Sequence, residues 1–376
     1  MDAGIPFPDL TDGPVRLRPR RTADDLPDVL ALCQDPDMRR WTTIPLPYEE
    51  RHALAFLSQA EPDRAAGRGY GLTVEYEGRF AGQVDLRPQS PGAAEVGYAL
   101  TPSARGHGVM TRALRLVLPW GFEALDLDVV HWRARVGNWP SRRVAWSVGF
   151  RHDGAVRDLL PRGAGPGRAA EPRRHDGWVA SLRRGEPLEP ARGWLVPPLL
   201  RTADAVLRAH RDDDAARMAQ ACADPVTQQW LPDLPAPYTQ DDARAHLAEV
   251  AEWHAGEKAV AWAVADPGSD ALLAEVAVFG VGGGSRRGEI GYWAHPDARR
   301  RRVVTRAVTA ATAHALRPAA GGGLGLDSVF RRAAEGNEAS IGVARQAGFL
   351  LAGRDSRAER LRDGTVCDHL RYERLA

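Results

Sequence analysis

Apolar and polar positions repeat along the chain either at the spacing of a helix face or in the alternation of a strand, and the first half shows both patterns most clearly. Residues Leu26, Val29, Leu30 and Cys33 recur at the spacing of one helix face, which predicts a helix after an opening strand at 15–19. Further helices are predicted at 49–61, 107–122 and 139–147, and strands at 70–76, 80–87, 94–100, 127–136, 150–158 and 174–183. The order β-α-α-β-β-β-α-β-α-β-β predicts a mixed α/β (α+β) domain with a partly parallel sheet.

The second half of the chain repeats the first. The segment EVGYALTPSARGHGVM at 95–110 reappears as EIGYWAHPDARRRRVV at 289–304. A charged stretch rich in proline and glycine at 185–190 is typical of a linker. The chain has 376 residues, and a domain has roughly 150, so we predict two tandem domains, residues 1–187 and 188–376.

Composition restricts the class of protein. Apolar residues make up 44% of the chain and charged residues 26%, and the formal net charge is +1. No uninterrupted apolar run is long enough to span a bilayer, and the charge balance argues against a nucleic-acid partner. The three cysteines lie far apart without metal-ligand spacing. We therefore expect a cytoplasmic protein with no metal site, no membrane association and no nucleic-acid partner.

Glycines mark a candidate anion site where a predicted strand gives way to a helix. Gly106 and Gly108 lack a Cβ, so the backbone there can take a positive φ and a ligand can approach it closely. The first turn of the following helix offers unpaired N–H groups and a partial positive charge, which suits a pyrophosphate. As a bare pattern, Gly-x-Gly fits a plain helix-opening loop equally well.

The order of several motifs makes this signal more specific. A strand with the sequence EVGY is followed by the glycine loop, a helix, a strand, Asn138 and Ser141, a further helix and Gly149-Phe150. Together these motifs resemble the GNAT (Gcn5-related) N-acetyltransferase superfamily, most closely the branch that acetylates ribosomal-protein N-termini and related amines. The resemblance covers nearly all of both halves. It implies two tandem domains, each a mixed, mostly antiparallel sheet with flanking helices and a splayed central parallel pair.

The resemblance also implies that acetyl-CoA (coenzyme A) is the cofactor. In this superfamily an Arg/Gln-x-x-Gly-x-Gly/Ala loop grips the pyrophosphate. Arg105, Gly108 and Met110 fill that pattern, with methionine in the place of a small residue. The cofactor-binding residues that it implies are Leu100, Arg105, Gly106, His107, Gly108, Val109, Met110 and Asn138.

Direct acetyl transfer requires an aligned amine, a donor to the thioester carbonyl and a proton for the leaving sulfur. The resemblance implies that Ser141 donates that proton and that Asn138 either contacts the pantetheine arm or positions the helix; each is also a suitable helix N-cap. Glu95 is the first candidate for the general base and Asp85 the second. Glu95 recurs as Glu289 in the second half, so a structural role is open as well. Side-chain alternation leaves open which face of the strand meets the acceptor.

Only the first half keeps the loop glycines. Arg300 and Arg302 stand in the places of Gly106 and Gly108, and we expect their side chains to block the pyrophosphate site, although a guanidinium can also grip a phosphate. We therefore predict a catalytic N-terminal domain and a C-terminal domain that is degenerate in cofactor binding. A fused copy can supply the interface that single-domain relatives form by pairing, which predicts an intrachain pseudo-dimer and leaves a further homodimer open.

The predicted function is acetyl-CoA-dependent N-acetyl transfer to an amine, either the α-amine of a protein N-terminus or a small-molecule amine. The alternatives are a non-catalytic acyl-CoA-binding or regulatory protein and an antibiotic-type small-molecule acetyltransferase. The basic loop at 161–175 is either a lid over the acceptor or a solvated hairpin loop.

Overall fold

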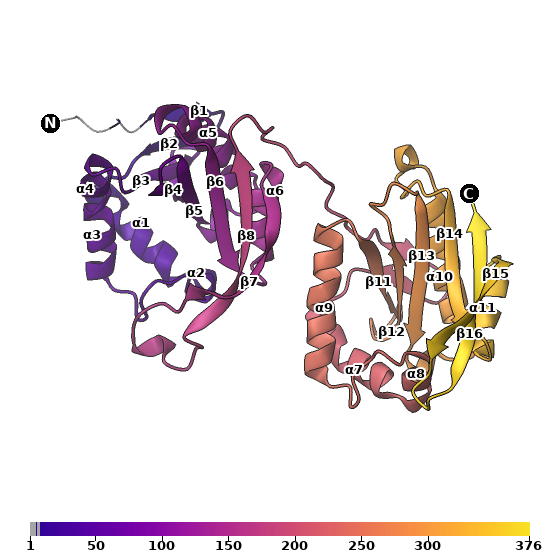
Figure 1. Ribbon diagram of the computed structural model, residues 1–376. Helices are drawn as coiled ribbons and strands as arrows, with labels where there is room; N and C mark the ends of the chain where they lie inside the picture. The colour runs from indigo at the N-terminus through magenta and orange to yellow at the C-terminus, as the bar shows by residue number, and fades with distance from the viewer. Residues whose placement is uncertain (1–4, 6–7) are drawn as a thin grey trace. The chain divides into compact units, whose positions relative to one another are not determined.

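The computed structural model describes residue 5 and residues 8–376, and the chain divides into two compact units, residues 1–191 and residues 192–376. The division falls after Ala191, whereas the linker composition placed it after residue 187. Each unit contains one eight-stranded mixed sheet with helices packed on it (Figure 1). This architecture confirms the predicted α/β class and the tandem repetition. None of the described helices has the length and apolar character that a membrane crossing requires.

The N-terminal unit follows the predicted order of elements, with a short first strand and a short second helix that the sequence pattern did not indicate. Its strands are β1 (Leu10–Asp12), β2 (Val15–Pro19), β3 (Tyr70–Tyr76), β4 (Arg79–Ser90), β5 (Ala93–Leu100), β6 (Val129–Arg135), β7 (Arg151–Pro161) and β8 (Arg174–Arg183). Its helices are α1 (Thr22–Gln34), α2 (Pro36–Trp41), α3 (Glu50–Ser58), α4 (Ala60–Ala65), α5 (Val109–Ala124) and α6 (Trp139–Ser147).

The C-terminal unit repeats this arrangement. Its strands are β9 (Leu200–Arg201), β10 (Val206–Arg208), β11 (Ala259–Ala265), β12 (Leu272–Phe279), β13 (Arg287–Ala294), β14 (Ser328–Ala334), β15 (Leu350–Arg360) and β16 (Val366–Leu375). Its helices are α7 (Ala215–Ala223), α8 (Pro225–Trp230), α9 (Gln240–Ala255), α10 (Val303–Leu316) and α11 (Glu338–Gln346).

Strand order is the same in both sheets, and each contains one parallel pair at its centre. The orders are β1-β2-β3-β4-β5-β6-β8-β7 and β9-β10-β11-β12-β13-β14-β16-β15. β5 and β6 pair in parallel only from Ala93↔Val129 to Val96↔Trp132, and β13 and β14 pair over a still shorter stretch. Beyond these residues the two strands of each pair separate. The splayed parallel pair that the resemblance implied is therefore present in both units.

Helix α5 covers one face of the N-terminal sheet because its apolar residues recur every three or four positions. Leu114, Val117 and Leu118 are fully buried against strand residues such as Leu72 and Val84. Helices α1 and α3 form a separate apolar cluster with the opposite face of the sheet. The opening between β5 and β6 thus lies between two helical layers.

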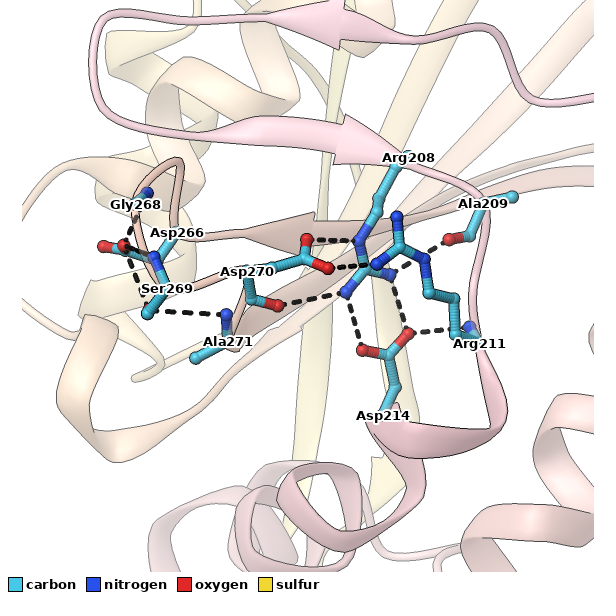
Figure 2. Close-up of polar contacts among 9 residues, drawn as sticks. All are labelled: Arg208, Ala209, Arg211, Asp214, Asp266, Gly268, Ser269, Asp270 and Ala271. Carbon is cyan, nitrogen blue, oxygen red and sulfur yellow. Dashed lines mark hydrogen bonds and ion pairs between the residues drawn. The ribbon is translucent and has the colours of Figure 1, made fainter.

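A buried ion pair ties the first long strand to the first helical segment of each unit. In the C-terminal unit, the Arg208 guanidinium donates two hydrogen bonds to Asp214, at 2.8 and 2.9 Å, and a third to Asp270 at 2.8 Å (Figure 2). In the N-terminal unit Arg18 and Asp25 form the equivalent pair at 2.6 Å. Each arginine has a second carboxylate partner, Asp270 or Glu75, so it is removal of the arginine that leaves a buried aspartate as an uncompensated charge.

Candidate active site

The glycine loop of the N-terminal unit has the backbone conformation that its residue types predict. Gly106 and Gly108 have φ angles of +79° and +72°, and a Cβ built on either would meet no heavy atom within 4 Å. Helix α5 begins directly after Gly108, and no side chain caps its first turn. The N–H groups of that turn therefore face a space that can admit an anion, which satisfies the first requirement of a pyrophosphate site.

Most side chains of this loop point away from that space or are already paired. Val109 and Met110 are buried in the core, so only their main-chain groups can reach a ligand. The Arg105 guanidinium is paired with Asp35 and Asp37 next to α2, with 2.7 Å to Asp37. Arg105 therefore anchors the loop, and anion binding falls to the main-chain amides.

The remaining loop residues differ in exposure. His107 is exposed, and its ring centroid lies 6.0 Å from that of Tyr76. Leu100 ends β5 beyond the last residue paired with β6, and its carbonyl oxygen accepts a hydrogen bond from Arg105 at 3.2 Å. These placements keep both residues at the edge of the cleft, where the resemblance assigned them to the cofactor.

Ser141 lies where β5 and β6 separate, in a network that orients its hydroxyl group. Asn138 caps α6 by accepting a hydrogen bond from the Ser141 N–H at 3.3 Å. The Trp132 indole N–H donates to Ser141 Oγ at 3.2 Å, and the Tyr98 hydroxyl donates to the Ser141 carbonyl oxygen at 2.7 Å. Burial raises the pKa of Tyr98, so its hydroxyl remains a donor. Since Ser141 Oγ accepts from Trp132, its own O–H stays available as a proton donor.

A cavity of about 320 Å³ adjoins Ser141 on the face of the sheet covered by α1 to α3. Residues 96 to 99 of β5 all line it. Gly97 and Ala99 pair with Asp85 and Gln83, which line it as well, so this face of the strand meets the cavity beneath α1 to α3. Apolar walls come from α1, α2 and Phe56 of α3. The polar lining comes from Gln83, Asp85, Arg87, Arg133, Arg135, Asn138 and Ser141.

The two candidate bases occupy different positions. Asp85 lines the cavity and lies 2.8 Å from Arg87, whereas Glu95 is not among the residues that line it. The Glu95 carboxylate lies 2.8 Å from Arg87 and 3.3 Å from Arg133, so two guanidinium groups already occupy its oxygens. Asp85 is itself paired, with Arg87 and with Arg20 at 3.6 Å, so its place in the cavity lining is what favours it over Glu95 as the carboxylate that faces an acceptor.

Sequence reasoning missed the arginines of the cavity. Gln83, Asp85 and Arg87 alternate in β4 with the buried Val84 and Leu86, and such an alternation could have indicated a polar surface on a covered face. Arg133 and Arg135 of β6 likewise alternate with the buried Trp132 and Ala134, so the same signal was available there, although only the tertiary structure shows that they line the cavity.

The basic loop at 161–175 packs against the segment that follows α2. Arg168 is fully buried and donates hydrogen bonds to the carbonyl oxygens of Ile44 and Arg39, at 2.9 and 2.8 Å. The Leu46 N–H donates to the Ala164 carbonyl oxygen at 3.0 Å. The loop is thus docked on the segment at 39–46, of which Thr43 and Ile44 line the cavity, and is not a solvated hairpin loop.

The C-terminal unit preserves the loop backbone without the glycines. Arg300 and Arg302 both have a φ of +60°, and α10 begins directly after Arg302 without a side-chain cap. A cavity of about 690 Å³ lies beside this loop, and Arg300, Arg302 and Arg331 help to line it. The two arginines therefore line this cleft without filling it. Because the loop backbone keeps the left-handed turns, only the arginine side chains could block a pyrophosphate there.

The acceptor side of the C-terminal unit is filled by large side chains. Trp293 pairs with Glu275 of β12, just as Ala99 pairs with Gln83 of β4. Tryptophan therefore replaces alanine on the cavity face. Phe279 takes the place of Arg87, and its ring lies 5.1 Å from that of Trp253. The positions that form an open acceptor cavity in the first unit are thus packed with aromatic residues in the second.

A buried carboxylate with histidine neighbours lies behind these aromatic residues. Glu275 is 2.9 Å from both His210 and His246. Burial opposes ionisation of Glu275, but the two imidazoles outweigh burial and lower its pKa. Burial, aided by the charge of His210, lowers the pKa of His254 to about 4. Within the described residues, no three histidine, cysteine or carboxylate side chains are placed to hold a metal ion.

Comparison with known proteins identifies the domain type. The family model "Acetyltransferase (GNAT) domain" matches residues 15–151 and again residues 204–350. The putative ribosomal N-acetyltransferase YdaF of Bacillus subtilis (strain 168) is 37% identical over 87 residues, which cover 23% of this chain and 48% of that protein. The chain therefore spans about half the length of this curated relative. An uncharacterized N-acetyltransferase, p20 of Bacillus licheniformis, is 25% identical over 143 residues, 36% of this chain and 79% of that protein.

Solved structures align with one unit at a time. RimJ of Mycobacterium smegmatis in complex with CoA-disulfide aligns with a TM-score of 0.39 and 25% identity, covering 45% of this chain and 82% of that chain. The microcin C7 self-immunity acetyltransferase MccE, in complex with acetyl-CoA and AMP, aligns with a TM-score of 0.40 and 16% identity, covering 46% and 93%.

Proposed function

The chain belongs to the GNAT acetyltransferase domain family through both of its halves, and on this premise we propose that its N-terminal unit transfers an acetyl group from acetyl-CoA to an amine. One observation carries the proposal: in that unit the Ser141 hydroxyl lines an open cavity where β5 and β6 separate, and the uncapped glycine loop follows the end of the same strand β5. A transferase needs these three parts together, because each serves a different group of the reaction.

The residues present fit the phosphate-bearing part of coenzyme A. No atom lies within 4 Å of a Cβ built on Gly106 or Gly108, so phosphate oxygens have room at the amides that begin α5. Acetyl-CoA supplies the thioester whose acetyl group is transferred. In our proposal Gly106, His107 and Gly108, with the amides of Val109 and Met110, hold the diphosphate, and Asn138 keeps α6 in position beside the pantetheine arm.

The chain's own residues then serve the transfer step. The Ser141 O–H donates a proton to the departing sulfur, and Trp132 holds the hydroxyl oxygen in place for this role. Main-chain N–H groups near Leu100, where β5 is no longer paired with β6, polarise the thioester carbonyl. Asp85 is the carboxylate that faces the cavity and can accept a proton from the acceptor.

We assign the C-terminal unit a non-catalytic role. Its loop glycines are replaced by arginines, and Trp293 and Phe279 pack where the first unit has its open cavity. An acceptor amine in the cleft of this unit would therefore meet the Trp293 ring in place of the open space beside Ala99. We further propose that this unit supplies a dimer-like partner within the chain and that the protein acts in the cytoplasm.

Thiol release from acetyl-CoA in the presence of N-terminal peptides and small amines tests the activity, and calorimetry tests the division of roles. We expect release with at least one amine class and one acetyl-CoA bound per chain. Binding without release for every amine would favour a non-catalytic acyl-CoA-binding protein. Two acetyl-CoA molecules per chain would contradict the assigned division.

A further inference from the structure

The acceptor cavity of the N-terminal unit carries more positive than negative charge. Three of its lining residues are arginines, Arg87, Arg133 and Arg135, whereas Asp85 is its only carboxylate. Arg87 and Arg133 are already paired, since both contact Glu95 below the cavity wall. Arg135 differs from these two arginines because its carboxylate partner, Glu171, is 3.5 Å away and also pairs with Arg168 at 2.8 Å.

Arg135 is nine-tenths buried and only partly satisfied. Its Nη1 donates to the Arg40 carbonyl oxygen at 2.9 Å. Its Nη2 is buried, makes no hydrogen bond with the described residues, and lies 3.5 Å from the Glu171 carboxylate. That carboxylate accepts its shorter hydrogen bond, at 2.8 Å, from Arg168. A buried guanidinium N–H without an acceptor is costly, and that cost would be relieved if the side chain turned toward an anion in the cavity that Arg135 lines.

The second unit provides an internal comparison, because Trp293 and Phe279 there replace Ala99 and Arg87, which line the cavity of the first unit. Ala334 occupies the position of Arg135, and Phe279 occupies that of Arg87. Arg87 and Arg135 are therefore not needed to build this fold. Arg133 has an arginine counterpart, Arg332, which pairs with Glu289 in the same way.

Building on the proposed function, we propose that the acceptor is a small amine that also carries a carboxylate or phosphate group, and that Arg135 binds this anionic group. The anionic group on Arg135 would hold the amine toward Ser141 and Asp85, which line the same cavity. A cavity of about 320 Å³ is at the small end of ligand sites, which suits an acceptor of amino-acid size or the first residues of a peptide. A polycationic amine, such as an aminoglycoside, would meet like charges there.

The test compares matched acceptors that differ only in charge. Thiol release from acetyl-CoA is measured for an amino acid and its amide, for an amino sugar and its phosphate, and for short peptides with aspartate or lysine as the second residue. We expect kcat/KM to be about 10- to 150-fold higher for the anionic member of at least one pair, as a charge-assisted hydrogen bond provides. The pairs distinguish carboxylate from phosphate and free amine from peptide.

Arg135→Met then assigns the preference to a residue. This variant keeps an unbranched side chain, and Glu171 retains Arg168 as its partner. We expect KM for the anionic acceptor to rise at least tenfold, while the neutral acceptor and acetyl-CoA affinity change less than threefold. Arg135→Lys should restore part of the preference. Arg184→Met is the control, since Arg184 pairs with Asp126 outside the cavity and should leave the preference intact.

The outcomes separate this inference from the proposed function. Equal losses for charged and neutral acceptors in Arg135→Met would overturn the inference, because a purely structural role predicts that result. Preference for neutral or cationic acceptors would overturn it as well. If no acceptor releases thiol, the proposed function fails, and calorimetric binding of the anionic and neutral amines to the acetyl-CoA-loaded chain still decides whether Arg135 selects an anion.

Discussion

Replacing Gly108 with arginine copies the second unit into the first and tests the anion site directly. Arg302, the equivalent residue, shows that arginine can take this left-handed backbone in the same loop, with a φ of +60° against +72° at Gly108. Because the space around a Cβ on Gly108 is open, the variant avoids a clash within the protein. We therefore expect Gly108→Arg to fold and to lose acetyl-CoA binding.

The two effects differ in size. A residue other than glycine in the left-handed region costs about 1–2 kcal/mol of stability. For a domain of this size that is a fall in Tm of roughly 2–8 °C. Binding should fall much further, because a side chain over the first turn of α5 displaces the anion from its amides. The loss of two hydrogen bonds to a charged group, at about 1.5 kcal/mol each, corresponds to a loss in affinity on the order of 100-fold.

Calorimetric titration with acetyl-CoA and thermal unfolding measure both effects on the same samples. Gly185→Arg is the matched control, because Gly185 also has a positive φ, +82°, and open space around its Cβ, but lies after β8 away from the loop. It should show the same fall in Tm and unchanged affinity. If Gly108→Arg keeps its acetyl-CoA affinity within threefold, the main-chain amides at the start of α5 do not bind the diphosphate as proposed. If that variant unfolds while Gly185→Arg does not, the space around Gly108 is not open as described.

Three further predictions concern the proposed proton donor, the buried ion pair of the C-terminal unit and the histidines near Glu275. Ser141→Ala should lower kcat by about 100-fold or more with little change in KM, as loss of a general acid does in steady-state kinetics, and a kcat within twofold of the parent would exclude that role. Arg208→Met leaves the buried Asp214 carboxylate without its charged partner, so urea unfolding should show a loss of about 3–5 kcal/mol, and a loss below 1 kcal/mol would contradict it. Burial opposes the charge of His246, but the Glu275 carboxylate outweighs burial and raises the pKa of His246. The protonated His246 therefore stabilises the fold below pH 6.5, and this stabilisation is lost as the pH rises through the pKa of His246 in the folded protein. His254, with its pKa lowered to about 4, destabilises the folded state as the pH falls from 6.5 toward 4. Urea unfolding between pH 5 and 8 should therefore show a stability maximum near the ordinary histidine pKa of 6.5, and His246→Phe should remove the alkaline decline; an unchanged decline in that variant would contradict the assignment.

Local signals in the sequence determined the duplication, the order of elements and the conformation of the loop. The helix at α5 follows from apolar residues at helical spacing, and the left-handed turns at Gly106 and Gly108 follow from the absence of a Cβ. These features depend on residues close together in the chain, so a single sequence contains the information. The short β1 and α2 escaped prediction because neither is long enough to show a period.

Only the tertiary structure decided the composition of the site. Strand pairing set which face of β5 meets the cavity, and it placed Glu95 between Arg87 and Arg133 instead of on the wall. Packing of α2 gave Arg105 its carboxylate partners, and packing of the loop at 161–175 set the surroundings of Arg135. These contacts join residues that are tens of positions apart, and strand register, which local periodicity does not encode, determines which of them meet.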